Sequence, residues 1–353
     1  MTAQSLAESP NASAGLRFAA TPNGGPPSLR TRFKAWWEGY DLSPPKKSLP
    51  ERRNGRFLHA PSRLPPPRQG QGQGQGQENP ESAEFSASNP YLPGMLSQNG
   101  APLWTTPRVR VVEQLWGVDF VSPGGEDYIP YLIRPLGLTP AMSVLDLAAG
   151  LGGTPRLMAQ KYGAWVTGLE RSPLLASEAM TRSSKAGLAK QAAISHYDPE
   201  NFHTHRRYDS VFAKELFYTI TNKHQLLDTL VESLKSRGQL LFTDYILDTH
   251  SGSPADILAW SRTEPLAATP WTLEQWAQEL HQRNLDLRIS EDITAMHQKQ
   301  VLHAMRILLT VLQESTLSEE VQAAYAEEVA LWAQRIKALR AGLRCYRFYA
   351  LKP

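Results

Sequence analysis

The central part of this chain is predicted to have an α/β fold, in which parallel strands alternate with helices. Residues 144–147 are apolar apart from one acid, Asp146, as expected of a central strand buried on both faces. Glycines within 150–153 allow a tight turn, and Pro155 suits the first turn of a following helix. The apolar strand Trp165–Leu169 comes next. This order of strand, turn, helix and strand is the unit of a parallel sheet covered by helices.

The same alternation continues along the chain. Ser172 can cap a helix that begins at Pro173 and ends near Gly187. We expect further strands at 192–196, 208–212 and 239–247, and a helix with an apolar face at 222–235.

A helical cap and two more strands are expected after residue 247. Residues 250–270 are rich in Ser, Pro and Ala and are predicted to form part of a lid. Thr272 and Gln275 form a capping box that begins a helix. A strand is predicted at 285–291, long amphipathic helices at 298–314 and 318–341, and a last antiparallel strand at 343–351.

Charge and cysteine content limit the possible functions. Residues 1–95 hold 11 Lys/Arg and 7 Asp/Glu, whereas the rest of the chain holds 26 and 27. The predicted catalytic region is therefore not a nucleic-acid binder by bulk charge. The single cysteine, Cys345, excludes an intrachain disulfide. No apolar run approaches the roughly 18–20 residues that cross a bilayer, and we expect a cytoplasmic location.

Residues 1–105 form a leader rich in Pro, Gly and Gln, for which we expect disorder, and residues 106–353 form the predicted catalytic domain. Within the leader, residues 29–42 combine four aromatics with three basic side chains. This segment could contact a membrane surface peripherally or dock on a protein. It could equally be a short helix that packs back on the domain.

The glycine turn and its flanking acids predict an adenosine-containing cofactor. A dinucleotide site would show G-x-G-x-x-G and would place a pyrophosphate at the helix N-terminus. Here Asp146 lies just before the glycines, where a carboxylate opposes a pyrophosphate and suits a cation. Glu170 ends the next strand and could accept both hydroxyls of a ribose.

This stretch resembles motif I of class I S-adenosylmethionine (SAM) methyltransferases, D-x-G-x-G-x-G, with Ala148 in place of the first glycine. The resemblance implies a Rossmann-like sheet of seven strands, the last one antiparallel. It places Asp146 at the amino-acid end of SAM and Glu170 at its ribose. It implies that Asp198 bonds the adenine, although an Asx turn before Pro199 is an alternative.

Residues 116–125, W-G-x-x-F-V-S-x-G-G, resemble the segment before motif I in phosphoethanolamine and glycine/sarcosine-type N-methyltransferases, where it lies over the cofactor. The predicted cofactor-binding set is Val121, Ser122, Asp146, Ala148, Gly150, Gly152, Glu170, Arg171, Asp198, Pro199 and Lys214.

The substrate side departs from that family. Its [RK]-D-x-x-x-H-I stretch has Glu215 and Thr219 here in place of the catalytic Asp and His. Threonine cannot serve as a general base near neutral pH. Glu215 and Tyr245 are the predicted catalytic residues; Tyr218, Asp244 and, more weakly, Arg344 are predicted to bind substrate.

We therefore predict a SAM-dependent methyltransferase that acts on a small molecule, with nitrogen as the expected acceptor. O-methylation of a small acid or phenol is the alternative in chemistry. A SAM-binding protein without catalysis, acting as a regulator or scaffold, is the alternative in class. The nine histidines form no metal-binding array, and no metal is predicted.

Overall fold

The computed structural model describes residues 95–248, 253–314 and 317–353; for residues 309–314 it describes the backbone only. A seven-stranded sheet in the order β3-β2-β1-β4-β5-β7-β6 runs through the described chain. Its strands are β1 (Ser143–Asp146), β2 (Trp165–Glu170), β3 (Ala192–His196), β4 (Tyr208–Lys214), β5 (Leu234–Leu247), β6 (Asp286–Asp292) and β7 (Leu343–Leu351). β1 to β5 pair in parallel, whereas β7 is antiparallel to both β5 and β6.

The strand order reverses at β1: β2 and β3 are added on one side of β1, and β4 is added on its other side. The carboxyl ends of β1 and β4 meet at this point, with Asp146 opposite Phe212 in the register. Open α/β sheets bind ligands in the crevice outside such a switch point. The predicted fold is therefore confirmed, including its seven strands and antiparallel end.

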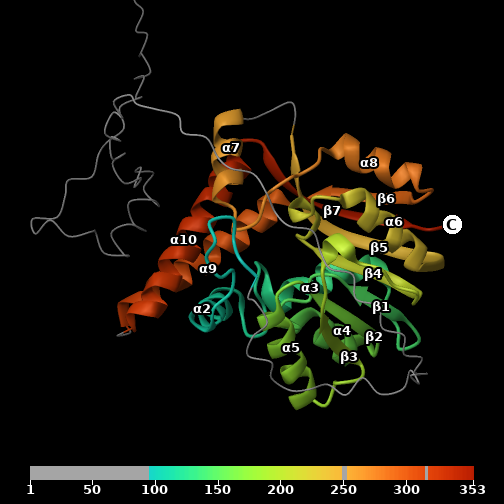
Figure 1. Cartoon of the computed structure of the whole chain (residues 1–353), viewed down its shortest axis with the longest axis horizontal. Coiled ribbons are helices and arrows are strands. Elements are labelled where there is room, and N and C mark those ends of the chain that lie inside the picture. Colours follow the sequence, from blue (N-terminus) through green and yellow to red (C-terminus); the bar gives the residue numbers. More distant parts are fainter. Residues whose placement is uncertain (1–94, 249–252, 315–316) are drawn as a thin grey trace, which may run out of the picture.

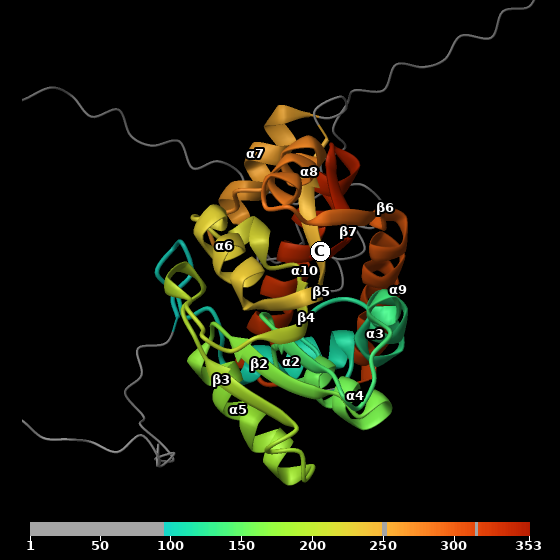
Figure 2. The same ribbon diagram turned by 90° about the vertical axis from the view of Figure 1, so that its right-hand side faces the viewer.

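Helices cover both faces of this sheet (Figures 1 and 2). In chain order they are α2 (Thr106–Trp116), α3 (Gly125–Ile133), α4 (Gly153–Tyr162), α5 (Pro173–Lys185), α6 (Lys223–Ser233), α7 (Pro254–Thr263), α8 (Leu273–Gln282), α9 (Thr294–Glu314) and α10 (Glu319–Arg340). Short 3₁₀ turns occur at 134–136, 199–201 and 217–219. In Figure 1, α2, α7, α9 and α10 gather at one end of the sheet; we call this group the cap.

The sequence signals for helix starts are confirmed. Ser172 accepts a hydrogen bond from Leu175 N–H as the cap of α5, and Thr272 and Gln275 form the complete capping box of α8. Several boundaries differ from the prediction; the helix expected to begin at residue 298, for example, begins at Thr294. The helix expected to reach residue 235 ends at Ser233, and β5 already begins at Leu234 because this leucine pairs with Tyr208 of β4.

Two apolar cores lie on opposite faces of the sheet. Leu241 and Tyr245 of β5 pack in the core with the cap helices, α3 and α4, whereas Leu240 and Phe242 pack in the core with α6 and α8. Neighbouring residues of one strand point to opposite faces. This division follows directly from the strand period of two.

Residues 95–105 already pack against the cap, although the predicted domain boundary is at 106. Leu103 is buried, and the Gln98 N–H donates to the Pro265 carbonyl. Folded contacts therefore begin at least eleven residues before that boundary. The aromatic and basic segment 29–42 lies outside the described residues. Among the helices that the structure describes, none combines the length and apolar character needed to span a bilayer.

Candidate active site

The glycine turn after β1 requires residues without a side chain. Gly150 and Gly152 have φ angles of 55° and 83°, in the left-handed region that favours glycine. A Cβ on Gly150 would lie 2.9 Å from Val121 Cγ2. The loop 117–124 therefore rests directly on the turn, as predicted for a segment that covers the cofactor site.

Asp146 ends β1 beneath this turn and is fully buried. Its Oδ1 accepts a hydrogen bond from Ala148 N–H at 3.1 Å, whereas Oδ2 has no hydrogen-bond partner among the described residues. Burial, reinforced by the nearby Glu170 carboxylate, raises the pKa of Asp146 to about 7. A buried carboxylate that lacks a partner for one oxygen suits a cationic group brought to the turn.

Glu170 holds the shape of the same turn from the end of β2. Its Oε2 accepts from Gly150 N–H at 2.9 Å, and its Oε1 accepts from Ser172 N–H at 2.8 Å. Burial raises the pKa of this carboxyl. Each carboxylate oxygen has a second lone pair, so Glu170 keeps acceptor capacity for ligand hydroxyls.

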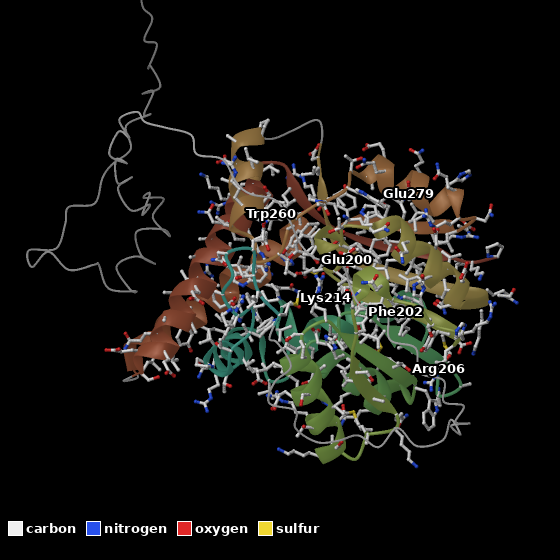
Figure 3. The ribbon with its side chains drawn as sticks, viewed as in Figure 1. Glu200, Phe202, Arg206, Lys214, Trp260 and Glu279 are labelled. Carbon is white, nitrogen blue, oxygen red and sulfur yellow. The ribbon has the colours of Figure 1, made fainter. Side chains whose placement is uncertain are left out.

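Lys214, at the end of β4, fastens the covering loop to the sheet. Its Nζ donates to Ser122 Oγ at 2.6 Å and to the Pro123 carbonyl at 2.7 Å. Burial lowers the pKa of this ammonium group. Figure 3 shows Lys214 near the middle of the molecule, between the sheet and the cap. The loop is also held by Asp119, whose Oδ1 lies 2.8 Å from Arg156 Nη2.

A cavity of about 180 Å³ opens where the sheet edge, the 117–124 loop and the cap meet. The residues predicted from the sequence that line this cavity are Val121, Ser122, Ala148, Glu170, Arg171, Lys214, Glu215 and Tyr218. Gly150 lines a smaller adjoining cavity of about 20 Å³. The structure thus brings most of the predicted cofactor residues and part of the predicted substrate set to one place.

Arg171 and Thr219 meet on the wall of this cavity. Arg171 Nη1 donates to Thr219 Oγ1 at 2.8 Å, and this hydroxyl in turn donates to the Leu216 carbonyl at 2.8 Å. Both the lone pair and the proton of the threonine are therefore engaged by neighbours. This geometry agrees with the expectation that Thr219 is not a base.

Asp198 forms the turn that the sequence offered as an alternative to adenine binding. It is exposed, its Oδ1 accepts from Glu200 N–H at 3.0 Å, and its Oδ2 accepts from Asn201 Nδ2 at 2.6 Å. Neither Asp198 nor Pro199 lines the larger cavity. Adenine contact through Asp198 stays a prediction.

Glu215 follows β4 and lines the cavity in a strained backbone conformation, with φ of 54°. Left-handed non-glycine residues cluster at functional sites. Glu215 Oε1 lies 3.7 Å from Nδ1 of His297, whose Nε2 lies 2.8 Å from the hydroxyl of Tyr245. Burial lowers the pKa of His297 to about 4. The sequence reasoning missed His297, since α9 carries no motif at this position.

Two further cavity residues were missed, Glu264 after α7 and Arg335 of α10. Arg335 donates from Nε and Nη2 to the two carboxylate oxygens of Glu264 at 2.7 and 2.8 Å. Its Nη2 also lies 3.2 Å from the Tyr218 hydroxyl, and Trp260 Nε1 donates to Glu264 Oε1 at 2.6 Å. The cap thus closes the cavity with a buried, bidentate ion pair.

Three predicted substrate-side residues lie behind or away from the cavity. Tyr245 and Asp244 are fully buried and do not line it; Asp244 Oδ1 instead accepts from Tyr218 N–H at 3.0 Å. Arg344 also does not line it and forms an ion pair with Asp248 at 3.2 Å. Asp244 and Tyr245 are consecutive residues of β5 and point to opposite faces of the sheet, so each is buried in the protein behind the cavity.

Comparisons with known proteins agree with this architecture. A family profile described as "Methyltransferase domain" matches residues 126–288. Phosphoethanolamine N-methyltransferase 1 of Zea mays is 25% identical over 233 residues, covering 65% of this chain and 45% of that protein. The enzyme of Plasmodium falciparum is 24% identical over 196 residues, covering 54% of this chain and 71% of that protein. The chain therefore spans about half the length of the maize relative.

Solved structures show the same fold. Haemonchus contortus phosphoethanolamine N-methyltransferase 2, in complex with S-adenosyl-L-methionine, superposes with a TM-score of 0.61 at 22% identity, covering 69% of this chain and 56% of that one. A putative sarcosine dimethylglycine methyltransferase from Galdieria sulphuraria gives 0.56 at 18% identity, covering 70% and 97%. The chain thus has the fold of class I methyltransferases, and its sequence is similar to those of phosphoethanolamine and glycine/sarcosine N-methyltransferases.

Proposed function

We propose that this chain is a SAM-dependent methyltransferase whose acceptor is the amine of a small molecule. The observation that carries the proposal is the unpartnered Oδ2 of fully buried Asp146, next to a glycine turn of left-handed backbone. An unpaired buried carboxylate oxygen costs free energy unless a ligand supplies a partner. The ammonium group at the amino-acid end of SAM is a suitable partner.

The remaining contacts of the cofactor follow from the residues around this turn. The missing Cβ of Gly150 leaves room for Val121 of the covering loop, and that of Gly152 leaves room for Arg156 and Ile194, so the turn can fold tightly beside the cofactor. Glu170 would accept hydrogen bonds from the ribose hydroxyls, while Val121 and Ser122 cover the cofactor from the loop. When bound, SAM supplies a methyl group on a positively charged sulfur, which leaves as a neutral thioether.

Glu215 is the group best placed to handle the proton of an amine acceptor. The amine must be neutral to use its lone pair, and after methylation its nitrogen is positively charged and can release one of the protons it already carried. Glu215 faces the cavity and can orient the amine and accept that proton. The Arg335–Glu264 ion pair and the cap exclude water and align the acceptor.

The amines named by the similar proteins are the first substrates to test. Phosphoethanolamine, glycine and sarcosine would be incubated with purified protein and SAM labelled in its methyl group. We expect label in one of these amines and its loss in Glu170→Ala, which removes two backbone contacts of the turn. Thr219→His tests whether the family's histidine raises turnover.

Two other results would redirect the assignment. Label in a small acid or phenol from a fractionated cell extract would establish O-methylation. Tight SAM binding without transfer to any fraction would favour a non-catalytic, SAM-binding role. No SAM binding by calorimetry would refute the proposal altogether.

The leader suggests a separate contact. We propose that residues 29–42, which lie outside the described residues, bring a cytoplasmic enzyme to an anionic membrane surface through aromatics and cations. Co-sedimentation with vesicles of phosphatidylserine and phosphatidylcholine tests this, with a chain lacking residues 29–42 as the control. Unchanged co-sedimentation after the deletion would rule out the membrane contact.

A further inference from the structure

A buried histidine lies directly behind the carboxylate that faces the substrate cavity. His297 comes from α9 in the cap, is almost completely buried, and packs its ring against Tyr245 and Trp332. Its Nδ1 is 3.7 Å from Glu215 Oε1, and its Nε2 is 2.8 Å from Tyr245 Oη. His297 thus bridges the carboxyl ends of β4 and β5.

The hydrogen-bond roles in this chain of groups follow from the protonation states. Burial raises the pKa of Tyr245 far above its usual value, so its hydroxyl keeps its proton and can donate it to Nε2. A neutral imidazole that accepts at Nε2 carries its proton on Nδ1. That N–H then faces the Glu215 carboxylate. The opposite tautomer would place a lone pair against a negative charge.

Burial, more than the surrounding charges, keeps the imidazole neutral. Glu215 favours its protonation, while burial, Lys214 and Arg335 oppose it, and the pKa of His297 is lowered to about 4. A neutral histidine near pH 7 donates one hydrogen bond and accepts another. It can therefore orient a carboxylate without neutralising it.

The separation of 3.7 Å is longer than a hydrogen bond, and such contacts are often long in ligand-free sites. Glu215 is held in the left-handed backbone region, and its N–H donates to the Thr243 carbonyl. Its backbone is thus fixed, while its Oε1 faces two donors, His297 Nδ1 at 3.7 Å and Lys214 Nζ at 3.8 Å. A small rotation of the carboxylate toward Nδ1 would form the bond.

We propose that His297, supported by Tyr245, is a positioning residue that aims Glu215 at the acceptor amine. This inference rests on the proposed methyltransferase function. The histidine beside the acceptor site would then come from α9 of the cap. The position where the similar enzymes have their histidine holds Thr219 here, and its hydroxyl accepts a hydrogen bond from Arg171. Glu215 touches the substrate, and His297 acts only through it.

The first test measures the imidazole itself and needs no substrate. The nitrogen shifts of ¹⁵N-histidine-labelled full-length protein, assigned through His297→Gln, report the tautomer and its titration. We expect the Nδ1–H tautomer near pH 7, and Glu215→Gln should lower the pKa of His297 because the carboxylate no longer favours its protonation. The Nε2–H tautomer, or a titration unchanged by Glu215→Gln, would overturn the proposal.

The second test is a double-mutant cycle with whichever amine accepts the label. His297→Leu should lower kcat by about 10²-fold, because a misaimed Glu215 would lose at least the low end of what a positioned acid or base contributes. The Kd for SAM should change less than about twofold. In the Glu215→Gln background the same substitution should cost less than about threefold, since residues that act as a unit are not additive. Equal losses in both backgrounds would show a merely structural role.

Two matched substitutions separate the ring nitrogens. Asn at 297 can place an N–H near the Nδ1 position, whereas Gln reaches toward Tyr245 from the Nε2 position. We expect His297→Asn to retain more kcat than His297→Gln; the reverse order would refute the assigned direction. His303→Leu, exposed on the same helix, is the control and should leave kcat unchanged.

The two tests also separate this inference from the proposed function. If no amine accepts the label but the tautomer and the Glu215→Gln shift are as expected, the proposed function fails and the histidine–carboxylate coupling stands. If methyl transfer occurs and the cycle is additive, the function stands and the positioning role fails.

Discussion

Asp146→Asn should make the protein more stable at high pH while it weakens SAM binding. The folded protein raises the pKa of Asp146 from 3.8 to about 7 because the carboxylate is fully buried. A group whose pKa is higher in the folded state stabilises at low pH, and this contribution is lost as pH rises through the folded-state pKa. Asparagine has no proton to lose, so the variant lacks this dependence.

The size of the effect follows from the pKa shift. Each unit corresponds to about 1.4 kcal/mol, so the stability of the wild type relative to Asp146→Asn should fall by about 3 kcal/mol between pH 5 and pH 8. Most of the fall should occur below pH 7. Urea unfolding of both proteins at several pH values measures this difference, in which other titrating groups cancel.

SAM binding provides the second measurement. The ammonium group of SAM favours ionised Asp146, so wild-type affinity should rise nearly tenfold per pH unit up to about pH 7 and level off above it. Asp146→Asn should bind at least about tenfold more weakly at pH 8, since a hydrogen bond to a charged group contributes about 1.5–3 kcal/mol. Parallel pH curves for the two proteins in both assays would refute the reasoning about Asp146.

Further substitutions test the turn and its covering loop. Gly152→Ala forces a side chain into left-handed backbone, with an isoleucine of β3 only 2.7 Å away, and should lower Tm more than Gly187→Ala, where φ is similar but no atom lies within 4 Å. Equal losses in Tm would mean that crowding is unimportant. Lys214→Met removes the two hydrogen bonds that hold the loop 117–124. It should speed SAM dissociation about tenfold, and it should also speed hydrogen exchange of the amides in that loop. The exposed control Lys185→Met should leave amide exchange in the loop unchanged. The same result for Lys214→Met would show that Lys214 does not hold the loop.

The cofactor side of the site could be predicted because its signals are local. Asp146, the glycine turn and Glu170 lie within one strand–turn–helix–strand unit, and the geometry of that unit follows from backbone preferences and strand burial. Helix caps such as Thr272–Gln275 are equally local, since the interacting groups are three residues apart. The last strand was predictable from its alternation.

The acceptor side depends on contacts between distant segments. His297 meets a tyrosine 52 positions earlier, and Arg335 reaches Tyr218 across 117 positions. Helical periodicity shows which face of α9 or α10 is apolar, but it does not show which strand that face will cover. For the same reason, the sequence did not show that Asp244, predicted to bind substrate, and Tyr245, predicted to be catalytic, lie behind the cavity.

By itself, the sequence determined the order of the strands and helices and the class of cofactor, because both depend on residues close together in the chain. The tertiary structure alone decided which groups surround the acceptor. The packing of the cap on the sheet brings His297, Glu264 and Arg335 to Glu215 and Tyr218, and only that packing replaces water around them with protein. Burial then lowers the pKa of His297.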